Sequence, residues 1–117
     1  MPEQYEDLVD ALKELEISGE TLPMAESEWY TRPDTASYGI VSIDMESGAL
    51  EGDDAKAATA WEGSVDLFSM TRSGAGWVEL ITETLADHCG TCWSLNSHTY
   101  ERDTGHFHWE WIFEVEG

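Results

Sequence analysis

Two segments of the chain carry hydrophobic residues at the spacing of an amphipathic helix. In the first, apolar residues recur three or four positions apart and acids fill the other face, which predicts a helix over about 4–17 with Gly19 as its stop. The second helix is expected over roughly 75–88, after the chain-breaking stretch Thr-Arg-Ser-Gly-Ala-Gly. The core-facing positions are Tyr5, Leu8, Leu12 and Leu15 in the first helix and Trp77, Leu80, Ile81, Thr84, Leu85 and His88 in the second.

The remaining patterned segments are short, rich in residues that favour strands, and mostly alternating. They predict strands at 23–30, 38–44, 60–70, 92–100 and 106–116. In the last strand, Phe107, Trp109, Trp111, Phe113 and Val115 point to one side, and His106, His108 and the glutamates point to the other. Gly63 lies on the apolar side of its strand, where it indicates a bulge or close packing against Trp77 or another ring.

The order of these elements is α-β-β-β-α-β-β, which is typical of an α+β fold. We expect a largely antiparallel sheet of about five strands with two helices packed on it. The chain has 117 residues, so residues 1–117 form a single domain with one core. With two cysteines and no long apolar run, it is not expected to carry a disulfide scaffold, a secretory signal or a membrane anchor.

The charge changes the functional picture more than any motif does. The chain has 25 acidic and five basic residues, a net charge of −20. Such a field repels nucleic acid phosphates and anionic membranes, so binding to either is not expected. Three interpretations remain: mimicry of DNA by carboxylates, a salt-loving host, or a surface that must repel DNA.

The stretch His88-Cys89-Gly90-Thr91-Cys92 is the first candidate for chemistry. Redox-active Cys-x-x-Cys pairs sit where a strand leads into a helix, because the helix N-terminus lowers the pKa of the first thiol. Here the pair follows the end of a helix, and Gly90 stands where a cap glycine is expected. The stretch is therefore interpreted as a turn.

Histidines near the C-terminus raise the possibility of a metal site. His106 and His108 share one side of their strand, and hairpin pairing could bring His98 beside them. The alternative is that all three are polar residues on an exposed face, as alternation alone predicts. The spacing of these residues and of Cys89 and Cys92 matches no zinc signature, so no metal or other cofactor is expected.

Catalysis has no support in the motifs. No glycine-rich phosphate loop, nucleophile elbow or local Ser/His/Asp arrangement is present, so the protein is not expected to be an enzyme. Most tryptophans fall on the apolar stripes of their own elements and are expected in the core. Trp29 lies on a weak edge strand and is the candidate for an exposed or interface aromatic.

Taken in order, the segments resemble a small tail protein of long-tailed phages, of the tail-terminator or tail-completion type. The resemblance is carried by the helix EDLVDALKELEI, the Trp29–Tyr30 strand, the strand YGIVSID with its loose acidic loop, the strand WEGSVDLFSM, the second helix, and the closing hairpin SHTYERDTGHFHWEWIFEVEG. It covers nearly the whole chain and contains no catalytic signature.

The resemblance implies a homo-oligomeric ring, a hexamer in typical tail terminators, at the head-proximal end of the tail. Tail tube protein and head-connector proteins would be its partners, and the virion neck its location, with assembly in the host cytoplasm. No cofactor or catalytic residue is implied. A negative lumen would let DNA slide without adhering.

The 46–58 segment is the expected contact device between subunits, because loops of this length in small domains are commonly functional. The candidate interface residues are Glu46, Gly48, Leu50, Asp53, Asp54, Lys56 and Trp29. The rival hypothesis from another class is an acidic DNA mimic that inhibits a DNA-handling enzyme. Mimicry would require carboxylates spaced like phosphates, whereas the acids here are spread over most elements.

Overall fold

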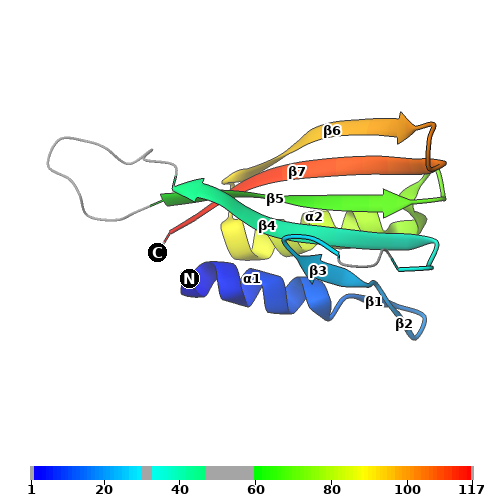
Figure 1. Ribbon diagram of the computed structural model, residues 1–117. Helices are drawn as coiled ribbons and strands as arrows, with labels where there is room; N and C mark the ends of the chain where they lie inside the picture. The colour runs from blue at the N-terminus through cyan, green and yellow to red at the C-terminus, as the bar shows by residue number, and fades with distance from the viewer. Residues whose placement is uncertain (1, 30–32, 47–59, 117) are drawn as a thin grey trace, which may run out of the picture.

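Two helices lie on one face of a five-stranded sheet in the computed structural model (Figure 1). The structure describes residues 2–29, 33–46 and 60–116. In chain order its elements are α1 (Glu3–Lys13), β1 (Glu16–Ile17), β2 (Glu20–Thr21), β3 (Met24–Glu26), β4 (Ser37–Glu46), β5 (Ala60–Ser69), the 3-10 turn η1 (Gly74–Gly76), α2 (Trp77–Cys89), β6 (Trp93–Glu101) and β7 (His106–Glu116). The α+β class, with a five-stranded, largely antiparallel sheet, is confirmed.

The order of strands across the sheet is β3-β4-β5-β7-β6. Neighbouring strands are antiparallel except β3 and β4, which pair in parallel over three residues of each. The central strands β5 and β7 pair from Ala60 opposite Glu116 to Ser69 opposite Phe107. The chain's last two strands therefore fill the centre and one edge of the sheet.

The end of α1 differs from the prediction. The helix ends at Lys13, and residues 16–21 form the two-residue strands β1 and β2. Ser18 and Gly19 lie between these strands with φ of 53° and 83°, which is the backbone of a two-residue hairpin turn. The expected helix over 4–17 was wrong at its end, because residues 16 and 17 belong to the first strand of this hairpin and not to the helix.

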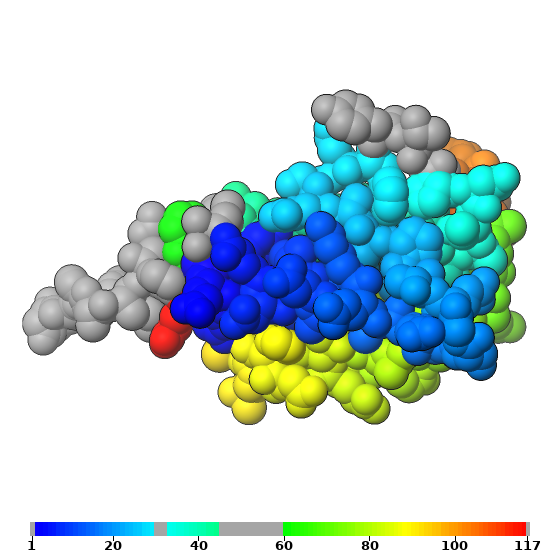
Figure 2. Space-filling model, turned by 90° about the horizontal axis from the view of Figure 1, so that it is seen from below, coloured from blue at the N-terminus to red at the C-terminus, as the bar shows by residue number. Residues whose placement is uncertain are grey.

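The core lies between the helices and the sheet. Tyr5, Leu8 and Leu12 of α1 and Ile81 and Leu85 of α2 are buried there. They meet the row of aromatic residues on β7, as in the stacked pair of Tyr5 and Phe113 with ring centroids 6.3 Å apart. Figure 2 shows α1 and α2 covering this face of the sheet. The predicted inward row of β7 is confirmed.

The close approach expected at Gly63 is also present. A Cβ placed on Gly63 would lie 2.6 Å from Cζ of Phe113 and 2.3 Å from the carbonyl oxygen of Ser42. Glycine is therefore required here by the ring on β7 and the backbone of β4. The helices cover one side of the sheet, so the functional surfaces of the described residues lie on its other face and at its edges.

Candidate functional site

Strand β6 forms one edge of the sheet, and its outer side has no strand partner among the described residues (Figure 1). Most of its side chains are exposed. Residues 88–100, which include nearly all of β6, contain no aspartate or glutamate, although acids make up 25 of the 117 residues. A long edge without charged or proline side chains is the kind that natural proteins pair with another strand or otherwise protect.

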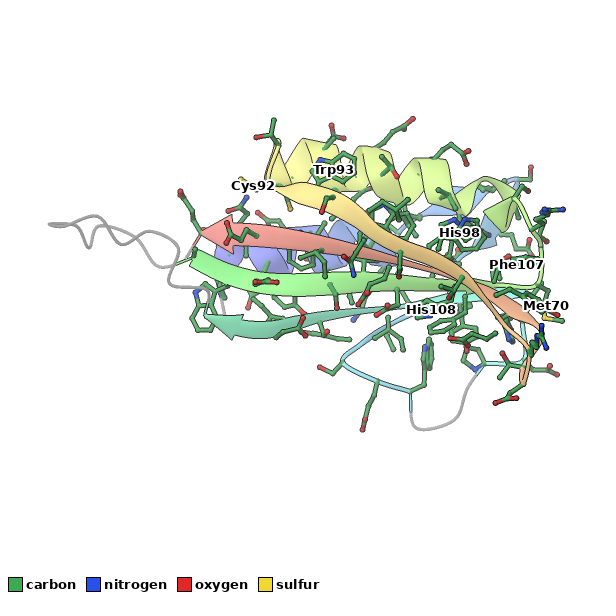
Figure 3. The ribbon with its side chains drawn as sticks, turned by 90° about the horizontal axis from the view of Figure 1, so that it is seen from above. Met70, Cys92, Trp93, His98, Phe107 and His108 are labelled. Carbon is green, nitrogen blue, oxygen red and sulfur yellow. The ribbon has the colours of Figure 1, made fainter. Side chains whose placement is uncertain are left out.

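Three large hydrophobic side chains are exposed in the described part of the chain, and all three lie at or beside this edge. Leu95 and Tyr100 belong to β6 and are 48% and 53% exposed, and Met70 follows β5 and is 53% exposed. Figure 3 places Met70 and Phe107 at the same end of the sheet, and the rings of Tyr100 and Phe107 are 4.8 Å apart. We call Met70, Leu95 and Tyr100 the edge patch.

The charges near the edge patch differ from those of the rest of the molecule. Arg72 and Arg102, two of the five basic residues, are exposed near it, one just after Met70 and the other in the turn between β6 and β7. The outer faces of the two helices instead carry acids, among them Glu6, Asp10 and Glu83. Glu101 and Asp103 flank Arg102, so cations and acids offset each other at this end of the edge, and two copies of the chain would repel less here than through their helix faces.

A bulge divides the edge strand. The register of β6 against β7 shifts between Leu95 and Ser97, and the Asn96 amide donates a hydrogen bond of 3.0 Å to Oε1 of Glu110. The segment from Ser97 to Glu101 pairs regularly with β7, so its outer side is the regular part of the open edge.

The uncovered face of the sheet carries a second cluster, centred on His108. Its Nε2 lies 2.9 Å from Oδ1 of Asp66 on β5, and its Nδ1 lies 3.0 Å from Oε2 of Glu101 on β6. The imidazole stacks on Phe68 with ring centroids 4.2 Å apart. The hydrogen bond to Asp66 is the main cause that raises the pKa of His108, with Glu101 adding to it and burial opposing it.

The protonated imidazole fits both contacts, because only this form has two N–H donors for two carboxylates. The cluster then links three adjacent strands, β5, β7 and β6. It adds a side-chain link between the edge strand and the centre of the sheet to the backbone pairing of β6 with β7.

The three histidines, which hairpin pairing could have brought together, do not form a group. His98 lies opposite Trp109 on the helix side and stacks on it at 4.4 Å, whereas His106 and His108 lie on the other face. The cause is the bulge at Asn96, since one extra residue in a strand reverses the faces that follow it. His106 is only 9% exposed, so it does not lie on an open face either.

No metal centre is formed in the part of the chain that the structure describes. There, no three His, Cys, Asp or Glu side chains are arranged to hold an ion. Asp66 and Glu101 flank the imidazole of His108 as its hydrogen-bonding partners.

The Cys-Gly-Thr-Cys stretch is a turn, as expected. The backbone N–H of Cys92 donates to the carbonyl oxygen of Cys89 at 2.9 Å, and Gly90 has φ 62°. Cys89 is buried and Cys92 is exposed. Burial, with a smaller contribution from Cys92, raises the pKa of the Cys89 thiol to about 11.

The structure places two of the candidate interface residues. Glu46 is the last residue of β4, where its backbone lies opposite Trp61. Trp29 is half-buried, donates from Nε1 to the carbonyl oxygen of Gly39 at 3.1 Å and meets Tyr38 edge-on. Gly48, Leu50, Asp53, Asp54 and Lys56 lie outside the described residues.

The sequence reasoning did not identify the open edge. The run 88–100 without acids was the available signal for an unusual surface. It could not identify an edge strand, because the place of a strand in a sheet depends on its pairing with other strands and not on its own residues alone. In the described residues, no helix is long and apolar enough to cross a membrane. No protein-family model matches the chain, and comparison with curated proteins gives no match.

Proposed function

We propose that this protein is a structural component of a long-tailed phage or prophage, of the tail-terminator or tail-completion type. In this role copies of the chain form a ring at the head-proximal end of the tail. The observation that carries the proposal is the open edge strand β6, which carries no acid before its last residue, Glu101, and bears the exposed Leu95 and Tyr100. The α+β fold, in the element order that suggested the resemblance, supports the same role.

Charge explains why self-association would be confined to this edge. At −20 per chain, two copies repel over most orientations, and the repulsion is weakest where acids are absent. The described exposed large hydrophobic residues gather at that place, and their burial contributes about 25 cal/mol per Å². Strand addition would also satisfy the outward backbone groups of β6.

A closed ring requires two different surfaces on each copy, because its contacts are heterologous. The sheet has two unlike edges in its described part. The β6 edge has the exposed cations Arg72 and Arg102 near it, and the β3 edge carries the exposed acids Glu26 and Glu28. Glu101 and Asp103 flank Arg102, so the β6 edge carries both signs of charge and differs from the β3 edge, as head-to-tail contacts between copies require.

In this function the ring contacts the tail tube on one side and head-connector proteins on the other, and it needs neither cofactor nor catalysis. The acidic remainder of the surface repels DNA, which suits a passage through which DNA must slide. The protein acts in the virion neck and is assembled in the host cytoplasm.

The test is the mass of the purified protein by light scattering and sedimentation, from low to high salt, with and without tail tubes. We expect a closed oligomer that electron microscopy shows as a ring, favoured by salt because salt screens the charge. A chain that stays monomeric in every condition, with and without tail tubes, would contradict the proposal.

A further inference from the structure

We propose that Cys89 and Cys92 are a modification site at which a reversible intramolecular disulfide joins the end of α2 to the start of β6. The site reacts with small disulfides by thiol exchange. This inference rests on the geometry of one turn and does not depend on the proposed function.

The turn brings the two cysteines to the required separation. Cys89 and Cys92 are the first and fourth residues of a turn closed by the 2.9 Å hydrogen bond between their backbones. Gly90 follows with φ 62° and ψ −114°, close to the first central residue of a type II′ turn. The Cα atoms that bound a β-turn are less than about 7 Å apart, and disulfides span about 4.4 to 6.8 Å.

The backbone around the turn is fixed on both sides. Gly90 donates to the carbonyl oxygen of Ala86 at 3.1 Å, which anchors the turn to the last turn of α2. Trp93 donates from its indole nitrogen to the carbonyl oxygen of Gly90 at 3.0 Å, and Glu114 donates from its backbone to that of Cys92 at 2.9 Å. The native fold therefore fixes the backbone that carries the two thiols.

The two cysteines differ in access, which sets the order of the reaction. Cys92, which Figure 3 shows beside Trp93, is exposed. It lines a surface hollow of about 290 Å³ together with Glu62, Trp93 and Glu114. Cys89 is buried, and its pKa is raised to about 11. Cys92 therefore meets the reagent, and Cys89 acts afterwards as the resolving thiol.

The exchange needs one small dialkyl disulfide as oxidant. The Cys92 thiolate attacks one sulfur of this reagent, its S–S bond breaks, and a thiolate leaves as the mixed disulfide forms on Cys92. The Cys89 thiolate then attacks Sγ of Cys92 and displaces the second thiolate. Two protein thiols lose their protons and are oxidised to one disulfide, while the reagent is reduced to two thiols that take up those protons.

The carboxylates at the hollow predict a preference among reagents. Glu62 and Glu114 line the space in front of Cys92, and the whole chain carries −20. Cationic cystamine should therefore react faster than neutral hydroxyethyl disulfide, and anionic glutathione disulfide more slowly. The differences should shrink with added salt.

The experiment treats the reduced full chain with hydroxyethyl disulfide and follows intact mass and free thiols. We expect a monomer that has lost two hydrogen atoms, with Cys89 and Cys92 joined in one proteolytic fragment. Cys89→Ser should stop at a stable adduct on Cys92, and Cys92→Ser should react much more slowly than the wild type. A wild-type product that remains a mixed disulfide, or that joins two chains, would overturn the proposal.

A second measurement tests whether the disulfide is favoured by the native turn or only by the short sequence distance between Cys89 and Cys92. The ratio of closed disulfide to mixed disulfide is measured against graded thiol in buffer and in concentrated urea. The folded chain should show an effective thiol concentration at least about tenfold higher than the unfolded chain. An equal or lower value in the folded chain would count against the site.

Discussion

The imidazole Nε2 of His108 lies 2.9 Å from Oδ1 of Asp66 on the sheet face that the helices leave uncovered. The second ring nitrogen of His108 is 3.0 Å from Glu101, so one ring bridges the centre and the edge of the sheet. The bridge ties the stability of the edge strand to the protonation of a single side chain.

Replacing His108 with glutamine should reduce stability in a pH-dependent way. The folded-state pKa of His108 is raised above its usual value of 6.5, so its contribution is full below that value and is lost as pH rises through the folded pKa. The free energy of unfolding of His108→Gln should therefore fall below that of the wild type by roughly 1 kcal/mol near pH 6. The difference should shrink toward pH 9, as urea titrations at each pH would measure.

The matched control for this prediction is His98→Gln. His98 stacks on Trp109 on the opposite face and has no ion pair in the described part of the chain. The stability difference between His98→Gln and the wild type should therefore not shrink between pH 6 and pH 9 as it does for His108→Gln. If the free energy of unfolding of His108→Gln differs from that of the wild type by the same amount at every pH from 6 to 9, the bridging role is contradicted.

Alanine at Gly63 should be strongly destabilising. Its Cβ would lie 2.3 Å from the carbonyl oxygen of Ser42, which the sheet holds in place, and 2.6 Å from the Phe113 ring. We expect a loss of about 2 to 3 kcal/mol in thermal or urea unfolding. Gly39→Ala is the control, since its nearest neighbour would be the flexible end of Met24 at 2.7 Å, and it should cost less. Equal losses for the two variants would show that the fixed backbone is not the cause.

The element order and the buried row of β7 could be predicted because each depends on a pattern within one segment. Two features could not. The end of α1 depends on whether Leu15 continues the helix or accepts a backbone hydrogen bond from Leu22. In the structure, the carbonyl oxygen of Leu15 accepts this hydrogen bond and the helix ends before it. The side of the sheet that His98 occupies depends on the bulge at Asn96, which is set by pairing with β7 rather than by the alternation of β6 itself.

The same limit applies to the candidate site. Cys89–Cys92 could be interpreted as a turn from a helix end and a glycine, which are local signals. The open edge could not, because it follows from the order β3-β4-β5-β7-β6 across the whole sheet. Edge and centre are decided by long-range pairing, so a strand such as β6 shows its role only in the folded chain.

The 46–58 segment remains a predicted contact device, and a deletion tests it. A variant lacking residues 47–57 should assemble less well than the wild type at the same ionic strength, as followed by light scattering. Its monomer should unfold at a similar urea concentration, because the core residues described here lie outside the deletion. Equal assembly of the two proteins would remove the segment from the interface without affecting the ring proposal.

The edge patch gives the most direct test of how copies of the chain meet. Leu95→Glu and Tyr100→Glu together place two negative charges on a strand whose one acid is its last residue, Glu101, and both side chains are about half exposed in the single chain. The double variant should therefore fold normally but lose at least about tenfold in association, since like charges would face the next copy. Ala86→Glu adds an acid at an exposed position of α2 and should leave association nearly unchanged. Sedimentation of the three proteins at several salt concentrations measures this directly. If the double variant assembles as well as the wild type, or if Ala86→Glu weakens assembly as much, β6 is not the surface through which the copies join.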